Sequence, residues 1–187
     1  MISFPNAKIN LGLYITEKRK DGFHSIETCF YPIPLCDALE ILPSKSTLFT
    51  SSGIDIPGSA KGNLCLQAYE LLKKDFDLPS VHIHLHKNIP IGAGLGGGSS
   101  DGAYTIKTLN KLFKLNLRED RMAEYAGKLG SDCPFFIYNN PLIARGKGDE
   151  FSSTSIQLSG KYMILVYPDV HISTAEAYAG VKPEYPG

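Results

Sequence analysis

The sequence predicts an α+β fold, and three observations lead to it. Segments in which apolar and polar residues alternate, such as 81–87, are interspersed with segments in which apolar residues recur every three or four positions, such as 64–76. No internal repeat or low-complexity linker separates them, so no domain boundary stands out. The 187 residues are 43% hydrophobic, which is enough to bury one core with at most a small appendage.

The first third of the chain is predicted to consist of strands. Alternating or apolar runs cover residues 7–15, 37–42 and 47–50. The turn-forming pairs Asp21-Gly22, Pro43-Ser44 and Ser52-Gly53 lie after the first, second and third run respectively, and they mark the ends of the predicted strands.

Helices and one more strand are expected in the middle of the chain. Asn63 can cap a helix over residues 64–76, whose apolar residues fall on one face and which Pro79 ends. The strictly alternating segment 81–87 is expected to be a strand that leads into a glycine-rich stretch. After the glycines, apolar residues between 103 and 113 predict an amphipathic helix, so the glycines form a strand-to-helix turn.

The last third is predicted to hold one more helix and one more strand. The helix is expected to begin at Asn116, with Glu119 as its capping-box partner, and to run to about Leu129. The apolar run 161–167 is expected to be a fully buried strand. A chain that stops soon after a core strand is expected to be a fragment of a longer protein.

The composition argues against nucleic acid and membrane partners. Lys plus Arg and Asp plus Glu number 19 each, so no basic excess attracts DNA, RNA or an anionic membrane. The four cysteines are scattered without a C-x-x-C pair, which is typical of reduced thiols in a cytoplasm. Neither a secretory leader nor a run of bilayer-spanning length is evident, so we expect a cytoplasmic protein. The sequence carries no signal for its oligomeric state.

The glycine-rich stretch is the strongest functional signal. Five glycines lie from Gly92 to Gly98, and two serines and an aspartate come directly after them. Backbone N–H groups at a glycine-rich turn that opens a helix bind anions, because no Cβ blocks close approach and the helix N-terminus carries roughly half a positive charge. A purely structural turn is the alternative, but five glycines exceed what a turn requires. The pattern favours a phosphate site.

Two well-known phosphate loops fit this stretch poorly. A Walker loop has a lysine and a hydroxyl residue after its last glycine, whereas Ser99 and Ser100 occupy those positions here without a lysine. Gly92, Gly94 and Gly97 satisfy G-x-G-x-x-G. A Rossmann unit also needs an acidic residue at the end of the next strand about 20 positions on, and that region reads as a helix here. A dinucleotide-binding fold is therefore the weaker interpretation.

Three ordered motifs carry a resemblance to a known family. Residues 90–102, PIGAGLGGGSSDG, resemble the second signature motif of the GHMP small-molecule kinases, P-x-G-x-G-L-G-S/G-S-S-A/D. Residues 4–41 are similar to the opening of the 4-diphosphocytidyl-2-C-methyl-D-erythritol kinases of that superfamily, P-A-K-x-N-L-x-L-x-I followed by R-x-D-G-Y-H-x-L-x-T. Residues 130–151 resemble their G-A/S-D-V/C-P-F-F segment with the strand and turn after it. The motifs cover nearly the whole chain.

The resemblance implies a fold and an activity. It implies that residues 1–160 form the N-terminal ATP-binding lobe of a GHMP kinase, of the ribosomal protein S5 domain 2-like type, and that residues 161–187 begin a second lobe whose remainder is absent. It implies a transferase that uses ATP and Mg²⁺ to phosphorylate the 2-hydroxyl of 4-diphosphocytidyl-2-C-methyl-D-erythritol in mevalonate-independent isoprenoid synthesis.

The resemblance also implies where ATP binds. Asn63 and Lys87 resemble positions near the adenine and ribose, and the glycine-rich stretch resembles the part that surrounds the phosphates. The residues implied there are Pro90, Gly92, Gly94, Leu95, Gly96, Gly97, Gly98, Ser99, Ser100 and Asp101. Magnesium is expected on the phosphates, since it neutralises charge in phosphoryl transfer, and Ser100 is the one side chain considered as its ligand.

Kinase chemistry needs a carboxylate that accepts the proton of a hydroxyl and a cation that spreads the charge of the phosphoryl group. Asp132, expected between a helix end and a strand, resembles the catalytic aspartate of the family, although on the residues alone it could equally tether its own turn. Lys8 shares a strand face with Asn10 and resembles the partner of Asp132, although a strand lysine is usually solvated. Asn10 resembles a residue that holds the erythritol part.

The resemblance places the cytidine on three residues. His24 resembles the residue that recognises the cytosine edge, although a lone histidine beside a turn is more often a surface or core residue. Phe23 stands where tyrosine is usual, which preserves stacking and loses a hydroxyl. Tyr178 is expected to supply a second stacking face.

Three alternatives stay open on the sequence. The first is another GHMP-type kinase with a different alcohol, and the stretch DGFHSIET (21–28) argues against it because it resembles the cytidine-reading segment. The second is a non-catalytic module that binds nucleotides or RNA, and the zero net charge argues against RNA. The third is a zinc site on His82, His84 and His86, for which a polar strand face is the favoured interpretation.

Overall fold

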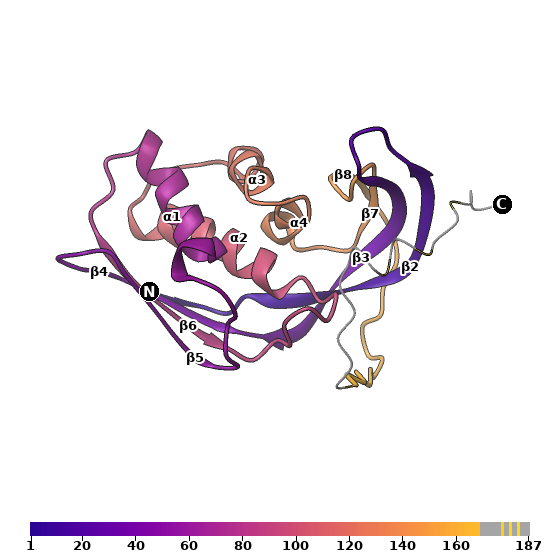
Figure 1. Cartoon of the computed structure of the whole chain (residues 1–187), viewed down its shortest axis with the longest axis horizontal. Helices are drawn as coiled ribbons and strands as arrows, with labels where there is room; N and C mark the ends of the chain where they lie inside the picture. Colours follow the sequence, from indigo (N-terminus) through magenta and orange to yellow (C-terminus); the bar gives the residue numbers. More distant parts are fainter. Residues whose placement is uncertain (169–176, 178–179, 181–182, 184–187) are drawn as a thin grey trace.

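The computed structural model describes residues 1–168 together with residues 177, 180 and 183, and their strands form two four-stranded sheets (Figure 1). Sheet A has the order β1 (Ile2–Ser3), β4 (Ala38–Pro43), β6 (Val81–Lys87), β5 (Leu48–Gly53). Sheet B has the order β2 (Asn6–Lys18), β3 (His24–Cys36), β7 (Leu142–Arg145), β8 (Glu150–Ser153). Neighbouring strands are antiparallel except β5 and β6, which run parallel.

The chain passes between the two sheets at two adjoining places. It leaves β1 of sheet A and enters β2 of sheet B at Asn6, and it returns from β3 to β4 at Asp37. The backbone N–H of Asp37 donates to the carbonyl oxygen of Pro5 at 2.8 Å, so the two passages are joined. We call Pro5 and Asp37 the sheet joint.

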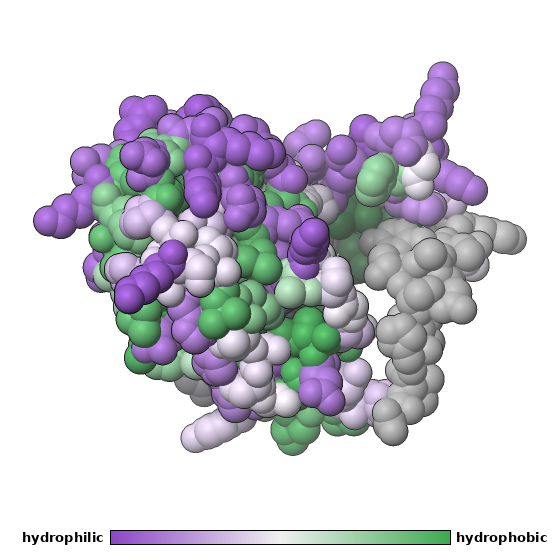
Figure 2. Space-filling view, turned by 60° about the vertical axis from the view of Figure 1, so that its left-hand side comes forward, coloured by the Kyte–Doolittle hydropathy of each residue, from purple (hydrophilic) through white to green (hydrophobic). Residues whose placement is uncertain are grey.

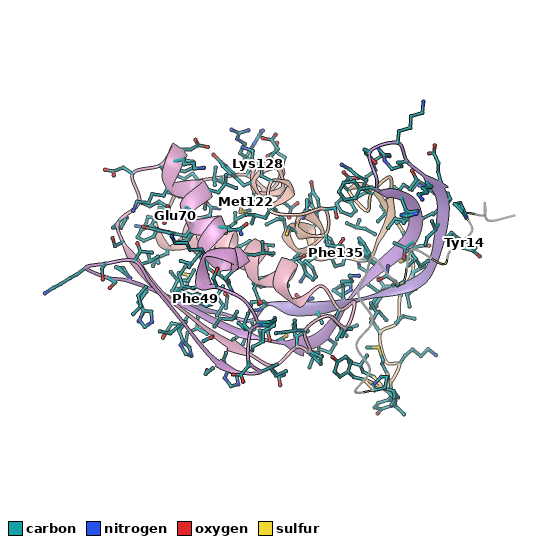
Figure 3. The ribbon with its side chains drawn as sticks, viewed as in Figure 1. Tyr14, Phe49, Glu70, Met122, Lys128 and Phe135 are labelled. Carbon is teal, nitrogen blue, oxygen red and sulfur yellow. The ribbon has the colours of Figure 1, made fainter. Side chains whose placement is uncertain are left out.

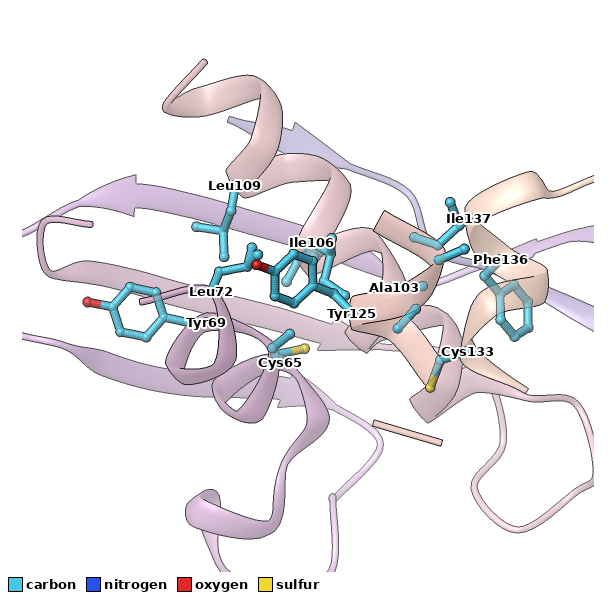
Figure 4. Close-up of a cluster of buried hydrophobic side chains, with 14 of the residues drawn as sticks. Cys65, Tyr69, Leu72, Ala103, Ile106, Leu109, Tyr125, Cys133, Phe136 and Ile137 are labelled. Carbon is cyan, nitrogen blue, oxygen red and sulfur yellow. The ribbon is translucent and has the colours of Figure 1, made fainter. Parts of the chain in front are cut away.

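Helices pack together against one side of the sheets (Figure 1). They are the short 3-10 helix η1 (Ala60–Gly62), α1 (Leu64–Asp75), α2 (Gly97–Leu112), α3 (Glu119–Gly127) and α4 (Cys133–Tyr138). Figure 4 shows their apolar side chains meeting in the main core, including Tyr69 and Leu72 of α1, Ile106 of α2 and Phe136 of α4. Full burial of each such side chain contributes about 1.5–3 kcal/mol, which makes these contacts the main support of the helical half.

Sheet B joins this core through aromatic contacts. Phe135 of α4 lies between the helices and sheet B (Figure 3), and its ring meets Phe30 of β3 edge to face with centroids 5.2 Å apart. Tyr14 lies on the outer curve of β2, where it is half exposed.

The surface is divided between hydrophilic and hydrophobic regions. In Figure 2, hydrophilic residues cover the upper part of the visible face, and hydrophobic residues gather below them and beside a hollow. In the part of the chain that the structure describes, no helix is long and apolar enough to cross a membrane.

Most predicted elements are confirmed. The structure is an α+β fold with strands at β2, β4, β5 and β6 and helices at α1 and α2, in the predicted places. Asn63 caps α1, since its side chain accepts a hydrogen bond from the backbone N–H of Cys65 at 2.9 Å. The strand predicted over 7–15 is part of the longer β2.

Strand β3 was missed by the sequence analysis. Pro32 and Pro34 interrupt its alternating pattern, and proline is normally confined to strand edges. Both prolines lie beyond the stretch Thr28–Phe30 that pairs with β7, so they fall where β3 has no partner on that side among the described residues. Strand β2 supplies the partner on the other side.

The predicted helix start at Asn116 was wrong. Asn116 has a positive φ of 56°, and α3 begins at Glu119 with Arg118 as an N-cap that makes no side-chain hydrogen bond. The Asn110 side chain explains the later start, because it bonds both the N–H and the carbonyl oxygen of Leu117. These bonds hold the connection between α2 and α3 as a loop.

The strand predicted over residues 161–167 was also wrong. These residues have no regular structure, and Tyr162, Ile164 and Val166 are largely exposed. An apolar run indicates burial, but a strand needs a neighbour, and none of the described strands pairs with this segment. The strand expected directly after Asp132 is instead helix α4, whose first turn contains Pro134.

Candidate active site

A cavity of about 320 Å³ lies against the turn between β6 and α2. Of the residues that the resemblance places near ATP, all except Ser100 line this cavity. Gly92, Gly94 and Gly96 have positive φ values of 74°, 72° and 69°. Only glycine adopts such values freely, so the turn exposes backbone in place of side chains. We call residues 89–96 the glycine loop.

The glycine loop ends where α2 begins. Gly96 is the N-cap of α2, and its carbonyl oxygen accepts the N–H of Ser100 at 2.9 Å. The first N–H groups of a helix have no partner inside it, and the helix dipole adds roughly half a positive charge at this end. Gly97, Gly98 and Ser99 of this first turn line the cavity. The arrangement suits a phosphate chain.

Gly96→Ala is expected to distort the loop. A Cβ at Gly96 would lie 2.8 Å from Cζ of Phe136, and the residue has a positive φ. We expect a loss of about 1–3 kcal/mol in the free energy of unfolding and weaker nucleotide binding. Urea unfolding and calorimetric titration with ATP measure both. Gly98→Ala is the stability control, because Gly98 has no heavy atom within 4 Å of its Cβ position and lies in a helix. Equal stability of the two variants would contradict the prediction.

Three buried ionisable side chains lie at the entry of the glycine loop. Lys87, the last residue of β6, donates through Nζ to Oδ2 of Asp37 at 2.5 Å and to Oδ2 of Asp101 at 2.7 Å. All three side chains are at most 4% exposed. Lys87 also lines the cavity, but its ammonium already donates to two carboxyl groups. Ser100 is fully buried, and its Oγ has no hydrogen-bond partner among the described residues.

Stability is expected to fall between about pH 4 and 8 because of Asp101. Burial raises the pKa of the Asp101 carboxyl from 3.8 to about 8, despite the opposing effect of Lys87, while Asp37 and the Cys65 thiol also face this cluster. The folded chain then keeps a proton that the unfolded chain releases. The free energy of unfolding therefore decreases as pH rises, by up to about 1.4 kcal/mol per pH unit.

The variant Asp101→Asn tests this pH dependence. Asparagine resembles the neutral carboxyl in shape, so its stability should change less with pH than that of the parent chain. Urea unfolding at pH 5, 6, 7 and 8 measures the difference. Parallel profiles for the two proteins would contradict the assignment.

Lys8 and Asp132 meet beside the glycine loop. Nζ of Lys8 lies 3.7 Å from Oδ2 of Asp132 and donates to Oδ1 of Asn10 at 2.7 Å. The Lys8 backbone N–H donates to the carbonyl oxygen of Leu95 at 2.9 Å, so β2 is bonded to the loop itself. The structure thus brings together the predicted lysine, the predicted aspartate and the predicted phosphate loop.

Burial affects Lys8 and Asp132 differently. The Lys8 side chain is 6% exposed and packs with its Nζ 4.7 Å from the centroid of the Phe30 ring. Burial lowers the pKa of Lys8, and the neighbouring Asp132 opposes that effect. The Asp132 side chain is 34% exposed, so a substrate can reach its carboxylate. A charged, desolvated donor next to an accessible carboxylate is suited to phosphoryl transfer.

Two residues in this part of the site were missed from the sequence. Thr28 of β3 accepts from Nδ2 of Asn10 at 3.0 Å and donates to the carbonyl oxygen of Gly12, which fixes Asn10. Gly148 lies in the turn after β7, and a Cβ built on it would lie 3.7 Å from Oδ1 of Asp132. Thr28 is the last residue of the stretch that resembles the opening motif of the family, but only recognition of β3 as the partner of β2 would have placed it beside Asn10.

Two of the residues expected to bind cytidine, Phe23 and His24, lie at the end of the β2–β3 hairpin. Phe23 is 60% exposed, and Nζ of Lys147 lies 5.3 Å from the centroid of its ring. His24 is the partly exposed first residue of β3. The N–H of Ile26 donates to the carbonyl oxygen of Gly146 at 2.8 Å, which holds the hairpin to the turn that carries Lys147. Tyr178 lies outside the described residues.

The three strand histidines form a polar ladder with two hydroxyls of β5. The Thr50 hydroxyl lies 2.8 Å from Nε2 of His82 and 2.8 Å from Nδ1 of His84. The Ser52 hydroxyl lies 3.0 Å from Nε2 of His84 and 3.0 Å from Nδ1 of His86. Within the described residues, no group of three or more His, Cys, Asp or Glu side chains is arranged to hold a metal ion.

The fold and the glycine loop define a small-molecule kinase of the GHMP class, since the family model described as "GHMP kinases N terminal domain" matches residues 63–140. The chain is 59% identical over 184 residues to a 4-diphosphocytidyl-2-C-methyl-D-erythritol kinase of Cytophaga hutchinsonii. The matched region covers 98% of this chain and 68% of the relative. The chain is 52% identical over 190 residues to the enzyme of the same name from Bacteroides fragilis, covering 100% of this chain and 69% of the relative. The chain belongs to the 4-diphosphocytidyl-2-C-methyl-D-erythritol kinase family.

Solved structures agree with this assignment. A crystal structure named 4-(cytidine 5'-diphospho)-2C-methyl-D-erythritol kinase superposes with a TM-score of 0.73 at 34% identity, covering 84% of this chain and 56% of that chain. The mevalonate kinase of Methanococcus jannaschii superposes with a TM-score of 0.63 at 18% identity, covering 83% and 56%. The second likeness shows a shared fold. The predicted lobe type is thereby confirmed.

Proposed function

We propose that this chain transfers the γ-phosphoryl group of ATP to the 2-hydroxyl of 4-diphosphocytidyl-2-C-methyl-D-erythritol, a step of mevalonate-independent isoprenoid synthesis. One observation supports the proposal above all others. Lys8 is bonded through its backbone to the glycine loop and faces Asp132 through its side chain. Lys8 therefore links the loop proposed to bind the phosphates of ATP to the carboxylate proposed to accept the proton.

Asp132 is the general base in this proposal. Its accessible carboxylate accepts the proton of the 2-hydroxyl as the oxygen attacks the γ-phosphorus, and ADP leaves along the glycine loop. Lys8 stabilises the negative charge that develops between them, and its low exposure strengthens this effect. Asn10, held by Lys8 and Thr28, orients the erythritol part.

The glycine loop and the first turn of α2 hold the phosphates of ATP. Asn63 and Lys87 lie on the cavity wall, which supports their assignment to the adenosine part in this proposal. Magnesium, when bound to ATP, neutralises phosphate charge. The Ser100 hydroxyl has no hydrogen-bond partner among the described residues, but it does not line the cavity. In this proposal the phosphates of ATP, rather than Ser100, would hold the magnesium ion.

The hairpin end holds the cytidine. Phe23 offers an exposed ring for stacking and His24 lies next to it, so the two can contact a base together. Tyr178 supplies the second stacking face. Residues 1–160 form the nucleotide-binding lobe, and 161–187 begin a second lobe. The exposed apolar side chains of Tyr162, Ile164 and Val166 support that division, since such a run favours burial against further structure. We place the protein in the cytoplasm.

A comparison of acceptor alcohols tests the proposed substrate. ADP release is measured with ATP and Mg²⁺ in the presence of 4-diphosphocytidyl-2-C-methyl-D-erythritol, mevalonate or homoserine, each at the same concentration. We expect release above the acceptor-free background with the cytidyl compound alone, and inhibition by CDP in competition with that compound. Release with mevalonate or homoserine instead would replace the substrate assignment by another alcohol.

A further inference from the structure

Asp37 was not recognised from the sequence, yet it connects the sheet joint to the glycine loop. It is 1% exposed and lies between β3 of sheet B and β4 of sheet A. Its backbone N–H is bonded to Pro5 on the other passage between the sheets. Its backbone is therefore held by both sheets, independently of the contacts that its side chain makes.

The Asp37 carboxylate holds the entry of the glycine loop through three bonds. Oδ1 accepts the backbone N–H of Asn88 at 2.6 Å and that of Ile89 at 2.8 Å, and Oδ2 accepts from Nζ of Lys87 at 2.5 Å. These three donors are consecutive residues at the end of β6 and the start of the loop. One side chain thus fixes the direction in which the chain leaves the sheet.

The anchoring extends to the other end of the loop. Lys87 also bonds Asp101 of α2 at 2.7 Å, and a Cβ built on Gly97 would lie 2.9 Å from Nζ of Lys87. Lys87 therefore packs directly beneath the first turn of α2. The Asp37 carboxylate, through Lys87, sets the distance between the entry of the loop and the helix end beyond it.

The sheet joint also separates the two halves of the site. The glycine loop comes after β6 of sheet A, whereas Lys8, Asn10 and Thr28 lie on β2 and β3 of sheet B. We propose that Asp37 is a positioning residue, which anchors the glycine loop to the sheet joint and so aligns the phosphates of ATP with Lys8 and Asp132. The proposal deepens the proposed function and rests on ATP binding at the glycine loop.

The first test measures the loop without any ligand. Amide hydrogen exchange is compared between the parent chain, Asp37→Ala and the matched control Asp77→Ala, which changes an exposed aspartate. In Asp37→Ala we expect residues 88–96 to exchange about tenfold faster, because two backbone donors lose a charged acceptor, with helix α1 unchanged. Unchanged exchange at 88–96, or equal acceleration in α1, would overturn the anchoring role.

The second test measures ATP and the acceptor separately. We expect Asp37→Ala to raise the Kd and the KM for ATP about tenfold and to leave the KM for the acceptor unchanged. A merely structural role would lower the amount of active protein and so kcat, without changing either KM. Asp37→Asn keeps the shape and one acceptor oxygen, so it should show a smaller effect in the same direction and serves if the alanine variant does not fold.

The two tests separate this inference from the proposed function. A parent chain that binds no ATP would contradict the proposed function, and hydrogen exchange would still decide whether Asp37 anchors the loop. Faster exchange at 88–96 with an unchanged Kd for ATP would overturn the positioning role.

Discussion

Replacing Asp132 with alanine is expected to lower kcat by about 10²–10⁴-fold while ATP binding stays nearly unchanged. The reason lies in the position of its carboxylate, which is one-third exposed beside Lys8 and does not line the cavity at the glycine loop. The variant therefore loses the acceptor for the proton of the substrate hydroxyl and keeps the phosphate contacts. Steady-state kinetics and calorimetric titration with ATP measure the two effects.

Asp77→Ala is the matched control for this variant, since it removes a carboxylate from the surface at a distance along the chain from the loop and the catalytic pair. Its kcat should equal that of the parent chain. A kcat for Asp132→Ala within a few-fold of the parent would remove Asp132 from the mechanism. A large loss of ATP affinity would assign it to nucleotide binding instead.

Lys8→Met is expected to lower kcat by about 10²–10³-fold. Methionine keeps an unbranched side chain of similar length, so packing against Phe30 and beside Gly96 is retained while the charge is lost. The phosphoryl group then lacks the buried cation that stabilises its developing charge. Removing a lysine whose pKa is lowered by burial should not reduce the stability of the fold, and thermal unfolding checks this.

Lys45→Met is the control for the loss of one positive charge, because Lys45 is exposed in the turn between β4 and β5. Full activity in Lys8→Met would show that the ion pair with Asp132 is structural. Partial activity in Lys8→Arg would support a requirement for charge, since arginine keeps the charge in a different shape.

The sequence predicted those parts of the fold in which local pattern and burial agree. The alternating β6 and the capped α1 have an amphipathic period that does not depend on distant residues, and both were found in place. Strand β3 depends on β2 and β7 for its pairing, and its prolines concealed it. The segment 161–167 showed the opposite error, because its apolar residues indicate burial without specifying a partner.

The site was predictable to a similar degree. The resemblance pointed to Lys8, Asn10 and Asp132, and the structure brings these residues together beside the glycine loop. The role of Asp37 could not be read from the sequence, because 51 and 52 positions separate it from the two backbone donors that it binds. Contacts of this kind are set by how two sheets meet, which no local pattern encodes.

Mass spectrometry of the product is the sharpest test of phosphoryl transfer by this chain. The chain is incubated with ATP, Mg²⁺ and 4-diphosphocytidyl-2-C-methyl-D-erythritol, with Asp132→Ala and the Cytophaga hutchinsonii relative in parallel. We predict that the substrate gains one phosphoryl group at its 2-hydroxyl with the parent chain and with the relative, and gains far less with Asp132→Ala. Phosphorylation by the relative but not by this chain, under identical conditions, would contradict the proposal that these residues alone carry out the transfer.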